Sequence, residues 1–152
     1  MLVAGVDCST KKISIFFIGD TEIPPLEIIS TLDDAPSRID EMYCKVTSIL
    51  SSYISDGLKM VYIENSPYLQ NIKVTLAIHS AVDAVRFSCV RSRIPYQTVE
   101  VTSWKKDVLG NGKADKSQIM SWAKAKYGDL ITSQDLADAA RIANYGYRRM
   151  VK

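Results

Sequence analysis

The stretch LVAGVDCSTKKISIFFIG, residues 2–19, decides the fold class because it holds two short apolar runs separated by a polar turn. Each run is rich in β-branched residues and too short for a globular helix, so strands are predicted at 2–7 and 13–19. A third apolar run, LEIIST at 26–31, follows a Pro-Pro turn and predicts another strand. Strands so close together in sequence are expected to form an antiparallel meander.

After the meander, the apolar residues first follow helical spacing. Further along, short strand-like apolar runs alternate with segments of helical spacing. Asp34 and Pro36 are typical of a helix start, and Asp56-Gly57 of a stop. The remaining elements are predicted as strands at 60–64 and 96–101, and as helices at about 69–91, 115–127 and 133–148. This order predicts an α/β fold in a single domain, 1–152, with a five-stranded mixed sheet and helices on both faces. The arrangement resembles the ribonuclease-H-like fold.

Four acidic residues interrupt or end apolar segments. Asp7 closes the first strand and Glu64 the fourth, while Asp135 and Asp138 lie three apart on one face of the last helix. If the first and fourth strands are parallel neighbours, Asp7 and Glu64 end side by side at the edge of the sheet where ligands bind. The last helix can then bring its two acids against them.

Crowded carboxylates repel one another and need cations or raised pKa values. Hard oxygen ligands suit Mg²⁺, for which Mn²⁺ can substitute. Two such ions can clamp the attacking water and the leaving oxygen of a phosphodiester. We therefore predict a metal-dependent phosphodiester hydrolase with two ions per active site and no small-molecule cofactor. Its catalytic metal ligands are Asp7, Glu64, Asp135 and Asp138.

Each acid also has a structural interpretation when taken alone. Asp7 can be a turn or cap residue, Glu64 a solvated residue before a loop, and Asp135 the cap of the last helix. Asp138, inside an Ala-rich apolar stretch, is the hardest to explain in this way. The prediction of a metal centre therefore depends on all four acids together.

The composition narrows the class of protein. The net charge is only +2, so a nucleic-acid surface must come from where the basic residues fall. The apolar runs are too short to cross a bilayer, and the chain starts on a predicted strand without a signal segment. Three widely spaced cysteines predict neither a disulfide framework nor a zinc site. A cytoplasmic protein with no membrane partner is expected.

The motifs resemble those of the RuvC family of Holliday junction resolvases over about residues 2–145. GVDCST at 5–10 resembles the family's first-strand motif, and YIEN at 62–65 resembles the strand with its catalytic Glu. DLADAARIA at 135–143 resembles its C-terminal Asp-x-x-Asp helix. The most specific part lies in TSWKKDVLGNGKADKSQI at 102–119, where a Lys precedes a Gly-x-Gly loop and a second Lys opens a helix.

The resemblance implies a homodimeric endonuclease that resolves four-way or other branched DNA by paired nicks. It implies that Lys105 and Lys116 act near the scissile phosphate, and that the helix at 69–91 contributes to the dimer interface. The excess of apolar residues on that helix agrees with such a role. Two departures suit a divergent, phage-encoded member, acting in a bacterial or phage-infected cell. Pro67-Tyr68 stands where the family often has an aromatic wedge, and Arg141 where an apolar residue is common.

Basic and aromatic residues near the acids are the predicted DNA contacts: Lys11, Lys12, Tyr68, Lys105, Lys106, Lys113 and Lys116. An ordinary surface lysine remains the simpler interpretation of Lys11, Lys12 and Lys106. Two other functions stay open, a nuclease of RNA–DNA hybrids with the same fold and a non-catalytic module that binds branched DNA.

Overall fold

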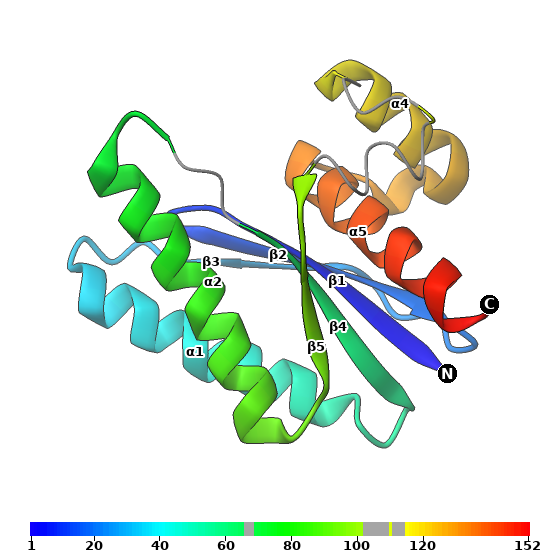
Figure 1. The fold of residues 1–152 in the computed structure, drawn as a ribbon, viewed down its shortest axis with the longest axis horizontal. Coiled ribbons are helices and arrows are strands. Elements are labelled where there is room, and N and C mark those ends of the chain that lie inside the picture. The colour runs from blue at the N-terminus through cyan, green and yellow to red at the C-terminus, as the bar shows by residue number, and fades with distance from the viewer. Residues whose placement is uncertain (66–68, 102–109, 111–114) are drawn as a thin grey trace.

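The computed structural model describes residues 1–65, 69–101, 110 and 115–152. The strands are β1 (Leu2–Cys8), β2 (Lys12–Gly19), β3 (Leu26–Ile29), β4 (Leu58–Glu64) and β5 (Tyr96–Val99). The helices are α1 (Ala35–Ser52), α2 (Ile72–Ser92), α4 (Lys116–Tyr127), the short 3-10 helix η1 (Gly128–Leu130) and α5 (Gln134–Met150) (Figure 1). None of the helices in these described ranges is long and apolar enough to cross a membrane.

The five strands form one mixed sheet in the order β3-β2-β1-β4-β5. β2 is antiparallel to both β1 and β3, whereas β4 is parallel to both β1 and β5. The predicted meander and parallel strands are thereby confirmed. The register pairs Val6 with Ile63, so the next residues, Asp7 and Glu64, end side by side on neighbouring parallel strands.

The two faces of the sheet carry separate apolar cores. Alternate residues of β1 such as Leu2, Ala4 and Val6 pack with α1 and α2, whereas Val3 packs with α4 and α5. Figure 1 shows the two helix pairs on opposite sides of the sheet. Asp7 follows the alternation of Val3, so it belongs to the face that α5 covers.

The helix α5 lies directly on the strands because glycines stand at the points of contact. A Cβ atom at Gly5 of β1 would lie 2.1 Å from the backbone nitrogen of Ala143 and 2.4 Å from the carbonyl oxygen of Ala139. Gly146 of α5 makes the equivalent approach to the ring of Tyr62, where a Cβ would come within 2.1 Å. The helix is thus held against β1 and β4 along its length.

Three elements are shorter in the structure than the sequence predicts. β3 ends at Ile29 rather than at residue 31, because its ladder pairs only with the first residues of β2. β5 ends at Val99 rather than at residue 101. α2 begins at Ile72 rather than near residue 69, because the side chain of Asn71 accepts a hydrogen bond from the backbone N–H of Val74 and caps the helix there.

Candidate active site

The carboxyl ends of β1 and β4 meet the first turns of α5 at one edge of the sheet (Figure 1). The backbone contact of Gly5 with Ala139 fixes the position of the helix over β1. Two residues further along the strand, on the same face, Asp7 lies close enough to the start of α5 for the charges of Asp135 and Asp138 to affect it. These two acids are one turn apart on the helix. The fold therefore brings the predicted acids to a common edge.

The electrostatics of Asp7 reflect this gathering of charge. Burial raises the pKa of Asp7 well above its ordinary value, and the charges of Glu64, Asp138 and Asp135 raise it further, against a backbone hydrogen bond from Cys8. Burial, followed by the charges of Asp7 and Glu64, also raises the pKa of the Cys8 thiol. Cys8 is therefore a protonated thiol at neutral pH and has no thiolate to act as a nucleophile.

The donor set suits a hard divalent cation, because it consists of carboxylate oxygens. Asp7, Glu64, Asp135 and Asp138 are each partly buried at the edge of the sheet. Within the described ranges, however, no three His, Cys, Asp or Glu side chains form a group that could hold a metal ion as they stand. Asp7 nevertheless lies within electrostatic reach of the other three acids.

Basic side chains of the chain itself come close to the acids. The Nζ atom of Lys12 lies 2.5 Å from Oδ2 of Asp135 and 3.3 Å from Oε1 of Glu27. Arg141, one turn beyond Asp138 on α5, is fully buried, and its guanidinium carbon lies 5.8 Å from the ring centre of Trp122. Burial lowers the pKa of Arg141 to about 10, against the charges of Asp138 and Glu64, so the guanidinium stays cationic at neutral pH.

The start of α5 shows that the interpretation of Asp135 as a helix cap is wrong. Asp135 is not the cap of this helix, because the hydroxyl of Ser133 accepts the hydrogen bond from the backbone N–H of Leu136 at 3.1 Å. Asp135 instead lies in the first turn, where the helix dipole favours a carboxylate. Its side chain is thus available to the edge of the sheet.

The predicted DNA contacts are only partly described. Lys11 is exposed and lies 3.6 Å from Asp33. Lys116 is the exposed first residue of α4, whose predicted start is confirmed by a capping box between Asp115 and Gln118. Tyr68, Lys105, Lys106 and Lys113 lie outside the described residues, so their roles stay predictions.

Sequence reasoning missed Glu27 and the role of Lys12 beside Asp135. The available signal was weak: Glu27 is a single acid in the short strand β3, whose other residues are apolar. Lys12 was expected at the mouth of the site, but its contact with Asp135 depends on how the start of α5 packs against β2.

Comparison with known proteins identifies the family to which the chain is similar. The family model described as "Crossover junction endodeoxyribonuclease RuvC" matches residues 23–144, a range that includes Glu64, Asp135 and Asp138 and begins after Asp7. The RuvC of Caldicellulosiruptor saccharolyticus is 28% identical over 108 residues, which cover 70% of this chain and 63% of that protein. The RuvC of Salinibacter ruber is 24% identical over 151 residues, covering 94% and 83%. The chain thus spans less than two thirds of the length of the first of these relatives.

Solved structures share the fold. Thermus thermophilus RuvC has a TM-score of 0.82 at 19% identity, and the likeness covers 99% of this chain and 97% of that one. A second structure of that protein, in complex with a Holliday junction substrate, has a TM-score of 0.84 and covers 99% and 96%. These similarities establish the ribonuclease-H-like fold, and the match over most of its length shows that the chain belongs to the RuvC family.

Proposed function

We propose that this chain is a metal-dependent endonuclease that resolves four-way DNA junctions, and other branched DNA, by paired nicks. The observation that carries the proposal is the gathering of Asp7, Glu64, Asp135 and Asp138 at the carboxyl edge of the sheet. Family membership supports a junction as substrate, since the family is described as a crossover junction endodeoxyribonuclease and a structure of similar fold contains a Holliday junction.

The four carboxylates are the proposed holders of two Mg²⁺ ions, with Mn²⁺ as a substitute. When bound, such ions activate the attacking water and stabilise the leaving oxygen of a phosphodiester. The chain itself supplies the placement, because Asp7 and Glu64 are fixed by the ladder between β1 and β4 while α5 holds the other two. Ligands on regular elements keep their geometry more rigidly than ligands on loops do.

Phosphate binding is proposed for three basic residues. Lys116 stands in the first turn of α4, so its ammonium and the N-terminus of the helix both favour an anion there. Lys105 is proposed by resemblance to act beside it. Lys11, with half of its side chain exposed, is a candidate for weaker, sequence-independent contact with the DNA backbone.

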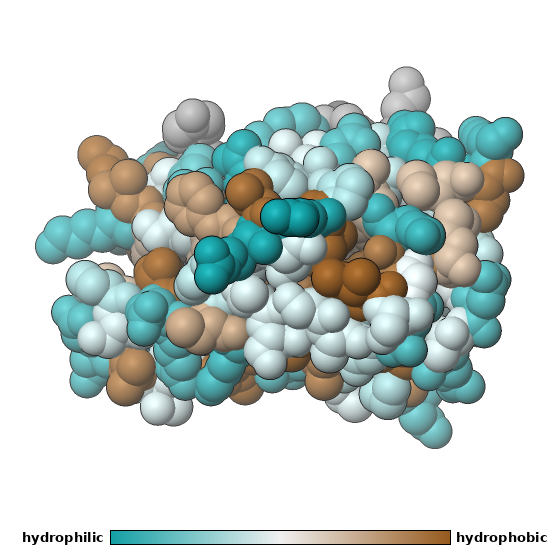
Figure 2. Space-filling model, turned by 90° about the horizontal axis from the view of Figure 1, so that it is seen from below, coloured by the Kyte–Doolittle hydropathy of each residue, from teal (hydrophilic) through white to brown (hydrophobic). Residues whose placement is uncertain are grey.

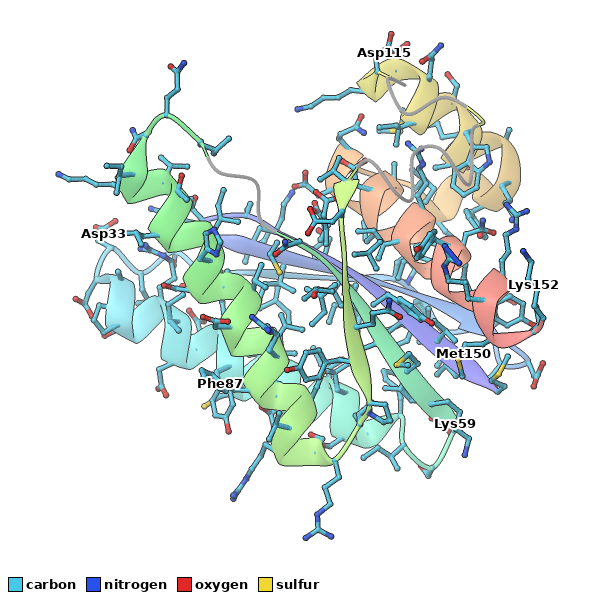
Figure 3. The ribbon with its side chains drawn as sticks, viewed as in Figure 1. Asp33, Lys59, Phe87, Asp115, Met150 and Lys152 are labelled. Carbon is cyan, nitrogen blue, oxygen red and sulfur yellow. The ribbon has the colours of Figure 1, made fainter. Side chains whose placement is uncertain are left out.

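We further propose that the chain acts as a homodimer, because paired nicks need two active sites. α2 carries two pairs of exposed apolar residues at helical spacing, Ile72 with Leu76 near its start and Phe87 with Val90 near its end, whose exposed fractions are 72%, 62%, 63% and 62%. The second pair borders a groove of about 750 Å³ between α1 and α2, which Ser80 and Asp83 also line. Figure 2 views the side on which these helices lie and shows apolar side chains on a largely polar face, and Figure 3 shows Phe87 directed away from the sheet. Such a surface is typical of a protein interface.

The test is cleavage of a synthetic four-way junction in Mg²⁺ by the wild type and by Asp7→Asn. The variant keeps the size of the side chain but loses its charge, so we expect cleavage to be about a hundredfold slower or more, with junction binding retained. A gel assay that separates nicked from fully resolved products measures both rate and pairing. A fully active variant contradicts the proposed role of Asp7.

The same assay distinguishes the two other functions. Faster cleavage of an RNA–DNA hybrid than of the junction indicates a hybrid nuclease of this fold. Tight junction binding without nicking in either Mg²⁺ or Mn²⁺ indicates a binding module. Four mutually repelling acids are costly for a protein that performs no metal chemistry, which argues against the binding module.

A further inference from the structure

A polar network lies behind Asp135 and joins three separate segments of the chain. The carboxylate of Glu27 on β3 accepts hydrogen bonds at Oε1 from the hydroxyls of Ser14, at 3.2 Å, and Ser133, at 2.6 Å. The same oxygen lies 3.3 Å from Nζ of Lys12, and that ammonium lies 2.5 Å from Oδ2 of Asp135. Glu27 thus connects the start of α5 and the side chain of Asp135 to the meander.

We propose that Lys12 and Glu27 act as positioning residues for Asp135, holding its carboxylate in the orientation in which it serves as a metal ligand; this inference rests on the proposed function. Lys12 donates directly to Asp135, and Glu27 holds Lys12. Glu27 also fixes Ser133, which caps the helix two residues before Asp135.

The charges of the network suit this role. A lone ammonium beside a metal ligand opposes the binding of a divalent cation, but the carboxylate of Glu27 balances the charge of Lys12. The hydrogen bond to Asp135 raises the pKa of Lys12, against desolvation. Burial acts to raise the pKa of Glu27, but hydrogen bonds from Ser133 and Lys12 outweigh it and lower that pKa. Both groups therefore remain charged at neutral pH.

The position of Lys12 favours this role over the DNA contact that its sequence position suggested. Only a quarter of its side chain is exposed, against about half for Lys11. Its ammonium is already shared between two carboxylates, so a phosphate would have to compete with both. Hydrogen-bond partners of metal ligands are known to tune metal affinity, and their removal typically weakens it by about 10- to 100-fold.

The experiment is calorimetric titration of the DNA-free protein with Mn²⁺. We expect Lys12→Met to bind Mn²⁺ about tenfold more weakly than the wild type. Glu27→Gln should weaken binding in the same direction, because it leaves the charge of Lys12 unbalanced and loosens Ser133. Lys12→Arg, which keeps a charged donor, should recover part of the affinity, and this recovery separates positioning from a general loss of structure.

Lys45→Met is the matched control. Nζ of Lys45 lies 2.6 Å from Oε1 of Glu41, and Glu41 also accepts a hydrogen bond from the hydroxyl of Ser30. The control therefore removes the lysine from a similar lysine–carboxylate–serine group elsewhere in the chain. Its Mn²⁺ affinity should equal that of the wild type. Circular dichroism of every variant checks folding, and if Lys12→Met does not fold, Glu27→Gln and Lys12→Arg decide the question.

The possible results separate this inference from the proposed function. Unchanged or tighter Mn²⁺ binding by Lys12→Met and Glu27→Gln overturns the positioning role while leaving a metal-dependent nuclease intact. A wild type that binds no Mn²⁺ overturns both. If Lys12→Met weakens junction binding but leaves Mn²⁺ affinity unchanged, Lys12 is a DNA contact and the positioning role is wrong.

Discussion

At the scale of the residue, the carboxyl of Asp7 lies in surroundings that disfavour its charge. Burial and the neighbouring acids raise its pKa, so ionised Asp7 lowers the stability of the folded, metal-free protein. The penalty is absent below the ordinary carboxyl pKa of about 4, where the group is protonated in both states. It grows as the pH rises from there toward the raised pKa of the folded state. A group useful for metal binding is thus destabilising without the metal.

Asp7→Asn should therefore stabilise the metal-free protein. In EDTA at pH 7 we expect a free energy of unfolding larger by about 1 kcal/mol or more, with the difference shrinking toward zero near pH 4. Urea denaturation at several pH values measures the effect. The sign is informative, because most buried substitutions destabilise. A variant that is less stable than the wild type at neutral pH contradicts a destabilising charge at Asp7.

At the scale of the element, α5 is positioned by glycines as much as by its apolar side chains. Every residue from Ala139 to Gly146 is buried, and within this stretch Ala139 and Ala143 contact β1 at Gly5. The absence of a side chain at Gly5 sets how closely the helix approaches β1. Since α5 carries Asp135 and Asp138, this spacing also sets the distance between those acids and Asp7.

Gly5→Ala should separate α5 from the sheet. The added Cβ would meet backbone atoms at 2.1 and 2.4 Å, and a helix backbone cannot yield as a flexible side chain does. We expect a loss of about 3 kcal/mol or more in urea denaturation. The control is Gly128→Ala, where the Cβ meets nothing within 4 Å and the cost, about 2 kcal/mol, comes from the backbone conformation alone, at φ +57° and ψ −131°. Equal losses in the two variants would contradict the close contact of α5.

At the scale of the whole molecule, the two helix layers have different roles. α4 and α5 cover the face to which Asp7 belongs, and α5 brings Asp135 and Asp138 to it. α1 and α2 cover the other face of the sheet. α2 packs one side into this core and leaves apolar residues such as Phe87 and Val90 exposed on the other. One layer therefore completes the candidate active site, and the other offers the proposed contact between two copies of the chain.

Phe87→Glu should disrupt the proposed dimer, because a carboxylate in an apolar interface loses its hydration without gaining a partner. We expect a dimeric wild type and a monomeric variant at micromolar concentration in analytical ultracentrifugation. Junctions should then be nicked once rather than resolved by paired nicks. Ile54→Glu, at a residue 45% exposed after α1, is the control and should stay dimeric. A monomeric wild type, or a dimeric Phe87→Glu, would contradict this interface.

Much of the fold could be predicted because the sequence reports burial in its periodicity. The short apolar runs around Asp7 and Glu64 predict strands, and the change to helical spacing predicts the covering helices. The pairing of Asp7 with Glu64 followed from one further rule, that parallel strands share their carboxyl edge. Boundaries were less accurate at Ile29 and Val99, where the strand ends with its hydrogen-bonding partner rather than with its own apolar pattern.

The sequence by itself therefore determined the order of elements, the mixed sheet and the four acids as candidates for one site. Only the tertiary structure decided which side chains surround those acids. Glu27 and Ser133 are 106 residues apart, and nothing in either local pattern signals their contact or that of Lys12 with Asp135. The physical reason is that periodicity records how a residue faces its own element's core, whereas a contact between distant elements depends on how those elements pack.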